Sequence, residues 1–135
     1  MRRGGAMAEK TLVIFEKPIY LCMEPVDPHL FATAFGVVET PVEVNVLLRD
    51  SAVTYAVERQ DMKGAKVLGV DVQEFDTNPA RVVKFMIENG GQVYVVREDA
   101  EARGIAPTDL VPGVRLISRE ETVGLIENHD AVMVW

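Results

Sequence analysis

The chain has 135 residues and a formal net charge of −7; 48% of its residues are hydrophobic and 26% are charged. This length and composition are typical of one globular domain with a real hydrophobic core. The acidic charge argues against nucleic acid as a directly bound partner, because neutralising phosphates needs clustered Lys and Arg. No apolar run approaches the roughly 20 residues that a membrane span requires, so we expect a cytoplasmic protein that does not bind a membrane.

The N-terminal segment MRRGGAMAEK has two arginines but no apolar stretch of the kind that a secretory signal carries. We expect residues 1–9 to be a flexible leader, with Met7 as a second candidate start, and residues 10–135 to form a single domain. The one cysteine, Cys22, cannot make an intramolecular disulfide, and no Cys/His spacing suggests a zinc site. We therefore predict that the protein holds neither a metal nor a cofactor.

The first half of the chain is predicted to alternate between strands and helices. Buried strands need continuous apolar runs, loops collect prolines, and helices repeat apolar residues three and four positions apart. By these criteria residues 11–15 form a strand, 16–28 a proline-rich loop and 28–38 a helix. A second strand follows at 42–49 and a short helix at 50–58. Asp50 or Ser51 is expected to cap the short helix. A polar turn at 59–66 follows, and then a weaker pattern at 67–72 that fits a strand or an irregular crossing.

The second half of the chain gives clearer signals. In NPARVVKFMIENGG (78–91), a proline stands at the first helical position and Gly90 ends the apolar face, so a helix is predicted. The sequence SREETVGLIEN (118–128) opens with Ser118 and Glu121 at the spacing of a capping box, which predicts another helix. The apolar face of the first of these helices is formed by Val82, Val83, Met86 and Ile87. The remaining elements are a third strand, a helical turn closed by Gly104, a fourth strand and a last strand, at residues 92–96, 98–104, 114–118 and 131–135.

Strands and helices thus alternate along the whole chain, and several strands are apolar on both faces. Strands of that kind are typical of a parallel sheet that helices cover on each side. We therefore predict an α/β fold, a three-layer sandwich around a mostly parallel sheet.

The stretch VYVVREDAEARG (93–104) changes abruptly from a buried strand into charged residues. Open α/β sheets usually bind ligands at the carboxyl ends of their strands, so Arg97, Glu98 and Asp99 are candidate substrate-binding residues. The alternative is structural: one carboxylate caps the following turn, and Arg97 pairs with one of the two acids. Arg49 ends the second strand and so points to the same edge, which makes it a further candidate.

Cys22 is the candidate catalytic residue, because a thiol in the loop after the first strand, close to a helix N-terminus, can be acidified into a nucleophile. Its neighbours Glu24 and Asp27 act in the opposite direction, since negative charge raises the pKa of a thiol. A small buried hydrophobe is the alternative role for a lone cysteine between Leu21 and Met23. The sequence has no Ser/His/Asp order, P-loop or Gly-rich dinucleotide fingerprint, which disfavours hydrolases, kinases and dehydrogenases that use them.

Three segments resemble the DsrE/DsrF/DsrH family, which includes the TusB, TusC and TusD subunits of the sulfur relay for tRNA thiolation. They are NPARVVKFMIENGGQVYVV, in which a helix leads through two glycines into a strand; EDAEARGI, which looks like the strand-end segment of the DsrH/TusB branch; and the tail GVRLIS…ETVGLIENHDAVMVW, with His129 and Trp135. The resemblance extends over residues 11–135 and is most specific after residue 78. It implies a flavodoxin-like fold and assembly as a homo-oligomer or as a hetero-oligomer with related DsrE-like subunits, with a sulfur-carrier protein as a further candidate partner.

The resemblance also implies that active subunits accept sulfur as a persulfide, on a cysteine just after the strand equivalent to QVYVV. Residues 95–100 of this chain contain no thiol, and a carboxylate cannot form a persulfide. The DsrH/TusB branch also lacks that cysteine and has one earlier in its chain, and Cys22 is early here. Glu98 and Asp99 are then better explained as a structural turn or as a charged contact to a partner subunit.

Three functional hypotheses follow from these observations. The first is a subunit of a sulfur-relay or sulfur-oxidation complex that does not carry the usual persulfide cysteine. The second is a sulfurtransferase that uses Cys22. The third is a module that binds a small ligand or a nucleotide through Arg49, Arg97 and the backbone at the helix starts.

Overall fold

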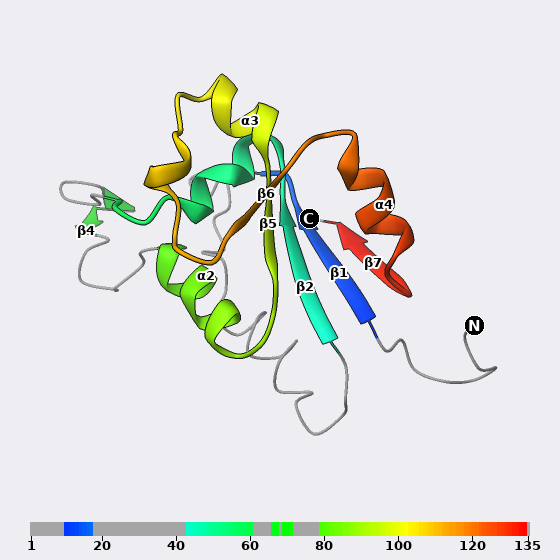
Figure 1. Ribbon diagram of the computed structural model, residues 1–135. Coiled ribbons are helices and arrows are strands. Elements are labelled where there is room, and N and C mark those ends of the chain that lie inside the picture. The colour runs from blue at the N-terminus through cyan, green and yellow to red at the C-terminus, as the bar shows by residue number, and fades with distance from the viewer. Residues whose placement is uncertain (1–9, 18–42, 61–65, 68, 72–78, 135) are drawn as a thin grey trace.

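The computed structural model describes residues 10–17, 43–60, 66–67, 69–71 and 79–134, which Figure 1 draws in colour. Its main sheet has five strands in the order β6–β5–β2–β1–β7, and every neighbouring pair is parallel. The strands are β1 (Lys10–Phe15), β2 (Glu43–Leu48), β5 (Val93–Val96), β6 (Arg115–Ile117) and β7 (Ala131–Val134). The predicted parallel sheet and its five predicted strands are confirmed.

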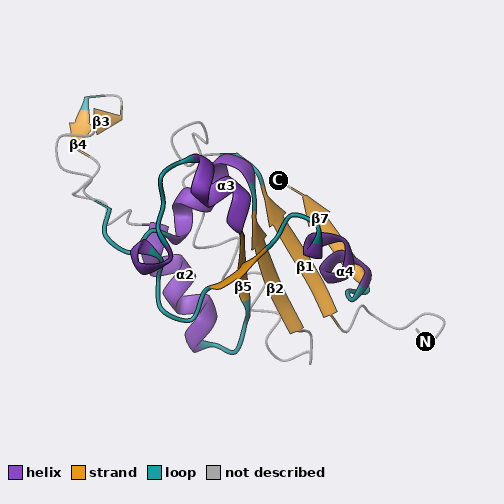
Figure 2. Cartoon of the chain, turned by 45° about the horizontal axis from the view of Figure 1, so that its top comes forward, coloured by secondary structure: helices purple, strands orange, loops and turns teal. Residues whose placement is uncertain are grey.

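Helices cover both faces of this sheet, so the predicted three-layer α/β arrangement is confirmed (Figure 2). One face packs against α2 (Pro79–Glu88), the 3₁₀ helix η3 (Asp50–Ala56) and α3 (Arg97–Ala102), and the other face packs against α4 (Glu121–Glu127). A short 3₁₀ helix, η5 (Pro107–Asp109), lies between α3 and β6. The weak pattern at 67–72 corresponds in part to a separate antiparallel pair, β3 (Lys66–Val67) and β4 (Val70–Asp71).

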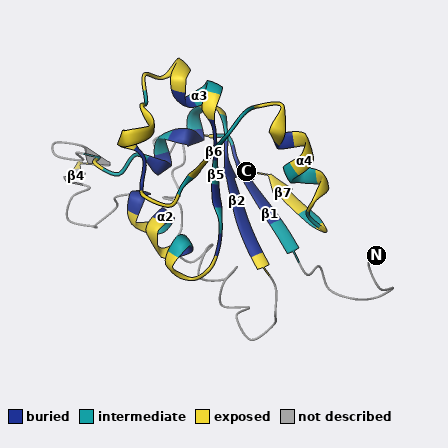
Figure 3. Cartoon of the chain, viewed as in Figure 1, coloured by how far each residue is buried: buried dark blue, intermediate teal, exposed yellow. Residues whose placement is uncertain are grey.

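Alternate residues of β2 face the two helical layers. Val46 and Leu48 pack in the cluster that includes α2 and η3, whereas Leu47 packs in the cluster that includes residues of α4. Every residue from Val44 to Leu48 is buried, as the dark blue of β2 in Figure 3 shows. A strand buried on both faces needs a continuous run of mostly apolar residues, and each such side chain contributes roughly 1.5–3 kcal/mol when it is removed from water.

The helix α2 agrees closely with its prediction. Val83 and Met86 are buried, while Val82 and Ile87 are partly buried and pack against the same cluster. Gly90 has a φ of 89°, a left-handed conformation that glycine adopts without the penalty of a Cβ atom. The apolar face and the helix stop predicted from the sequence are therefore confirmed.

The capping box predicted at the start of the last helix is also present. The N–H of Glu121 donates to Ser118 Oγ at 3.1 Å, and the N–H of Ser118 donates to Glu121 Oε1 at 3.2 Å. These contacts with Ser118 lower the pKa of the Glu121 carboxyl, because they favour its charged form.

Asn45 is a polar side chain inside β2, and only 1% of its surface is exposed. Its Oδ1 accepts the N–H of Gln92 at 2.9 Å, and its Nδ2 lies 2.8 Å from Glu43 Oε2 and 3.0 Å from His129 Nε2. The Nδ1 of His129 lies 2.7 Å from the carbonyl oxygen of Leu125. That nitrogen therefore carries the proton, and Nε2 accepts from Asn45. Through these bonds Asn45 joins the centre of the sheet to the end of α4.

Some predictions fall outside the described residues. They concern the leader at 1–9, most of the loop at 16–28, the helix at 28–38 and the candidate catalytic residue Cys22. No helix in the described part of the chain is long and apolar enough to cross a membrane. That residues 10–135 form a single domain stays a prediction.

Candidate functional site

The connections that leave two neighbouring strands, β5 and β6, pass to opposite faces of the sheet. The connection after β5 contains α3, whose Ala100 packs with α2 and η3; the connection after β6 contains α4, whose Leu125 and Ile126 pack on the other face. In open α/β sheets, ligands bind outside the carboxyl ends of the strands. The residues that follow β5, from Arg97 to Asp99, lie at such an end.

Asp99 connects the ends of three strands. Its Oδ2 accepts the N–H of Asp50 at 2.7 Å, and its Oδ1 accepts a hydrogen bond from Nη2 of Arg119 at 2.7 Å. Asp50 lies just beyond β2 and Arg119 just beyond β6, while Asp99 itself follows β5. The Asp99 side chain is 15% exposed and that of Arg119 is 65% exposed, so the carboxylate is partly shielded from water whereas the guanidinium is not, and the charge attraction between them is screened as in other surface pairs.

Asp50 depends on these contacts, because it has a φ of 54°. A left-handed backbone costs most residues roughly 1–2 kcal/mol, although Asp tolerates it better than most. Its Oδ1 accepts from Nη2 of Arg103 at 2.8 Å, and the same nitrogen lies 3.2 Å from Ser51 Oγ. The prediction that Asp50 or Ser51 caps the next helix is therefore wrong: η3 begins without a side-chain cap bond, and Arg103 binds both side chains instead.

Glu98 binds the backbone that precedes α4. Its two carboxylate oxygens lie 2.9 and 3.0 Å from the backbone nitrogen of Arg119 and accept its N–H. This hydrogen bond is the main reason that the pKa of Glu98 lies below its ordinary value; its own N–H and the positive charges of Arg119 and Arg97 act in the same direction. An N–H group that could bind an anion in the crevice is thus taken by a carboxylate of the chain itself.

Arg49 and Arg97, the two cations predicted to bind a ligand, have different surroundings. Arg49 donates from Nε to Glu16 Oε1 at 3.1 Å and also bonds to that oxygen through Nη2, which joins the ends of β2 and β1. The side chain of Arg97 is exposed and forms no side-chain hydrogen bond or ion pair with another described residue, although its charge lowers the pKa of Glu98 and of Glu121. The pairing of Arg97 with Glu98 or Asp99 that the structural alternative assumed is not formed.

The side chains of Arg119 and Arg103, and not that of Arg97, form ion pairs with the acidic residues at this edge of the sheet. No sequence motif marks Arg119 as a binding residue. It directly follows Ser118, at the end of a predicted parallel strand, and this position predicts that it lies at the carboxyl edge of the sheet. Its own pKa is raised, chiefly by the hydrogen bond to Asp99. Which acid each arginine contacts depends on how β2, β5 and β6 are ordered, and that order is a tertiary property.

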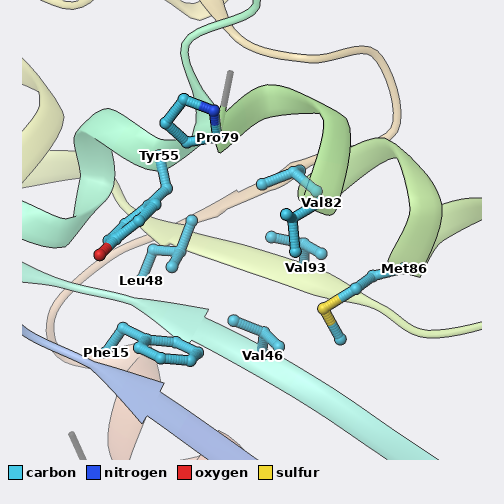
Figure 4. Close-up of a pocket in the computed structure, with 9 residues that line it drawn as sticks. Phe15, Val46, Leu48, Tyr55, Pro79, Val82, Met86 and Val93 are labelled. Atoms are coloured by element: carbon cyan, nitrogen blue, oxygen red, sulfur yellow. The ribbon is translucent and has the colours of Figure 1, made fainter. Parts of the chain in front are cut away.

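An apolar hollow lies between α2 and the sheet, beside η3 (Figure 4). It leaves about 10 Å³ for the centre of a water-sized sphere, which is room for about one water molecule. The residues that line it are Phe15, Val46, Leu48, Tyr55, Pro79, Val82, Val83, Met86 and Val93. A space this small and this apolar is a gap in packing and does not fit a nucleotide or another small polar ligand.

A second, open depression lies beside the crevice and is lined by Ser118, Glu120, Glu121, Gly124 and Leu125. Its two glutamates make it unfavourable for an anion such as a phosphate. Within the described ranges, no group of three or more His, Cys, Asp or Glu side chains is placed to hold a metal ion.

The replacement Asp99→Ala is expected to lower the free energy of unfolding by about 0.5–1.5 kcal/mol, because the N–H of Asp50 and the guanidinium of Arg119 lose a hydrogen-bond acceptor. Asp99→Asn should cost less, since an amide oxygen still accepts one of the two bonds. Urea denaturation measures both changes. Glu101→Ala, at an exposed position of the same helix, is the control and should shift stability by less than about 0.5 kcal/mol. A loss at Asp99→Ala no larger than that of the control would contradict the role of Asp99.

The stability of the fold should depend on the charge of Glu98. Because the folded protein lowers the pKa of this carboxyl below 4.5, the carboxylate stabilises the fold above that pH, and the contribution is lost as the pH falls through the folded-state pKa. Glu98→Gln should therefore unfold at a lower temperature than the wild type at neutral pH, and the difference should shrink in acid. Melting curves recorded from neutral pH to about pH 3 test this, with Glu101→Gln as control. A difference between Glu98→Gln and the wild type that stays constant over this range would argue against it.

Comparison with known proteins connects the crevice to a family. Residues 76–132 match the family model described as "DsrH like protein". This range contains α2, β5, α3, β6 and α4, and therefore both sides of the crevice between β5 and β6. No curated protein matches the chain in sequence.

Several solved structures are similar to this chain over nearly their whole length. The ychN protein from E. coli is 17% identical, with a TM-score of 0.69 and an alignment that covers 94% of this chain and 99% of ychN. MTH1491 from Methanobacterium thermoautotrophicum, a protein of unknown function, is 14% identical, with a TM-score of 0.59 and coverage of 92% and 96%. BT1422 from Bacteroides thetaiotaomicron, also of unknown function, is 14% identical, with a TM-score of 0.56 and coverage of 94% and 95%.

Identities this low show a shared fold and carry no activity from one protein to another. The resemblance predicted for the second half of the chain is nevertheless confirmed by the match in sequence. Residues 76–132 are similar to the family described as DsrH-like, and they lie within a flavodoxin-like α/β fold.

Proposed function

We propose that this protein is a subunit of a sulfur-transfer complex, in sulfur relay or sulfur oxidation, and that it does not itself carry the usual persulfide cysteine. The observation that carries this proposal is the segment after β5. In the wider DsrE/DsrF/DsrH family that the chain resembles, active subunits hold a reactive thiol at this strand end, whereas the DsrH/TusB branch lacks it and residues 95–100 here contain none. The chain then completes a site in which a related subunit supplies the thiol.

The contacts of Glu98 and Asp99 support a bracing role at this strand end. Both carboxylates bind Arg119, one through its backbone and one through its side chain. A carboxylate oxygen can accept hydrogen bonds but cannot take up a sulfur atom as a persulfide. Residues that hold strand ends together in this way shape an edge that a partner can recognise, without reacting themselves.

Arg97 is the residue that we propose as the contact to a DsrE-like partner. It is exposed at the start of α3, next to two braced carboxylates, and no described residue neutralises it through an ion pair. A positive charge at the rim of a shared site favours a thiolate or persulfide anion on the partner, because it stabilises the charged form. We propose a cytoplasmic location for the complex, where thiols are kept reduced.

A first experiment asks whether the chain accepts sulfur. The purified protein, alone and together with a DsrE-like subunit that has the cysteine, is incubated with a persulfide donor and examined by intact-mass spectrometry. We expect the mass of one sulfur atom to appear on the DsrE-like subunit and not on this chain. Cys22→Ser is the control. A gain on this chain that is absent from Cys22→Ser would overturn the proposal and favour a sulfurtransferase that uses Cys22.

A second experiment tests the contact through Arg97. Arg97→Glu should weaken binding to the DsrE-like subunit by about two- to tenfold at low salt, and the loss should fall at high salt because the charges are screened. Arg59→Glu is the matched control. Arg59 is also exposed, but it lies shortly after η3 and is far from Arg97 in the sequence. The proposal fails if the wild-type chain does not associate with such a subunit at all. A rise in melting temperature of the chain alone with nucleotides or sulfur anions would favour the ligand-binding module instead.

A further inference from the structure

The turn between α2 and β5 contains the pair Asn89-Gly90, and both residues are exposed. The other asparagines of the chain precede Val46, Pro79 and His129. Only Asn89 is followed by a glycine. A side chain on the next residue hinders access to the backbone nitrogen of that residue, and glycine has no side chain. This pair is therefore the one in which an asparagine side chain reacts most readily with the backbone.

The turn has the hydrogen bonds of a Schellman motif, which ends α2 before the chain enters β5 (Figure 1). The N–H of Gly91 donates to the carbonyl oxygen of Met86 at 2.9 Å. The N–H of Gly90 donates to the carbonyl oxygen of Ile87 at 3.2 Å. Gly90 also supplies the left-handed backbone of the motif, with a φ of 89°. Asn89 thus stands between the last residue of the helix and the residue on which the turn depends.

The side chain of Asn89 is held against the helix by a hydrogen bond. Its Nδ2 donates to the carbonyl oxygen of Phe85 at 2.8 Å, at an exposed position. This bond satisfies one of the carbonyl groups that a helix leaves without partners at its end. Hydrogen bonds at an exposed helix end open at a small cost in free energy. The amide group is therefore released at intervals and then reaches the backbone nitrogen of Gly90.

We propose that Asn89 is a site of spontaneous deamidation in the folded protein and that its conversion loosens the end of α2. The backbone nitrogen of Gly90 attacks Cγ of Asn89, and the C–N bond that forms closes a succinimide ring. The bond from Cγ to Nδ2 breaks, and Nδ2 leaves as ammonia together with the proton that the nitrogen of Gly90 gives up. Water then opens the ring at either carbonyl carbon, which yields aspartate or isoaspartate. The reaction consumes one water molecule and involves no oxidation or reduction.

Each product weakens the turn in its own way. In aspartate, a carboxylate replaces the donor Nδ2, and its charge faces the carbonyl oxygen of Phe85 at the end of the helix where the macrodipole is also negative. In isoaspartate, the backbone gains a carbon atom before Gly90, so the hydrogen bond from Gly91 to Met86 loses its geometry. Because α2 packs against the sheet, a looser helix end lowers the stability of the fold. This modification does not depend on sulfur transfer.

A time course at mildly alkaline pH tests the site, because the attacking nitrogen reacts after it loses its proton. The folded protein is incubated, digested in acid, which preserves the amides, and examined by mass spectrometry for conversion of amide to acid. Asn128 is the internal control, since it is also exposed and directly follows a helix, but His129 comes after it. Asn89 should convert about tenfold faster than Asn128, which corresponds to a barrier lower by about 1.4 kcal/mol.

The same time course in urea measures how far the turn protects the site. Asn89 should convert faster in urea than in the folded protein, because the hydrogen bonds at Nδ2 and at the N–H of Gly90 restrain the reacting atoms. The variant Asn89→Gln should give no acidic form of the folded protein on ion-exchange chromatography over the same period. Conversion of Asn89 in urea alone, or conversion in the folded protein no faster than that of Asn128, overturns the proposed site.

The variant Asn89→Asp reproduces one product and tests the consequence for α2. Its melting temperature at neutral pH should lie roughly 2–6 °C below that of the wild type. Asn128→Asp is the matched control: it adds the same charge after a helix, but Asn128 has no side-chain hydrogen bond to another described residue that could be lost. An Asn89→Asp variant as stable as the wild type, or no less stable than Asn128→Asp, overturns the loosening of the helix end.

Discussion

All strands of a parallel sheet bring their carboxyl ends to one edge, where charged and backbone groups need partners. In this protein the carboxylate of Asp99 meets that need for three strands, because it accepts the N–H of Asp50 and a guanidinium hydrogen of Arg119, each at 2.7 Å. This contact lies beside the left-handed backbone of Asp50, at the entry into η3, and beside the segment that leads into α4. Arg103 and Glu98 strengthen it from either side.

The same contact limits what the crevice can do. Where open α/β sheets usually receive an anion, this chain presents its own carboxylates to the N–H and the guanidinium of Arg119. A ligand would have to displace both Glu98 and Asp99 and leave the strand ends without their connections. This cost agrees with a subunit that shapes a shared site, and it leaves Arg97 as the cation that can face a partner. A carboxylate that holds two strand ends together is not available to bind a ligand at the same position. Here Glu98 and Asp99 both bind Arg119.

Two edges of the main sheet differ in character. The carboxyl edge is charged and is held by ion pairs, which suits a selective contact with a related but different subunit. The edge at β7 is apolar and exposed. At the amino ends of the strands, Asn45 and His129 fix the end of α4, and β7 follows directly from there. The position of β7 is thus set by the sheet core.

Within the described residues, the sequence by itself determined the strands of the main sheet and the helices α2 and α4. Continuous apolar runs predicted the five strands, and local signals, such as the capping box of Ser118 and Glu121 and the stop at Gly90, predicted the helices, because these features act over a few residues. The cap at Asp50, the pairing of Asp99 with Arg119 and the exposure of β7 were decided only by the tertiary structure. Each depends on which strands are neighbours in the order β6–β5–β2–β1–β7. That order brings together residues that are far apart in the chain, such as Asp50 and Arg103, which are 53 positions apart, and contacts of such long range leave no periodic pattern in the chain.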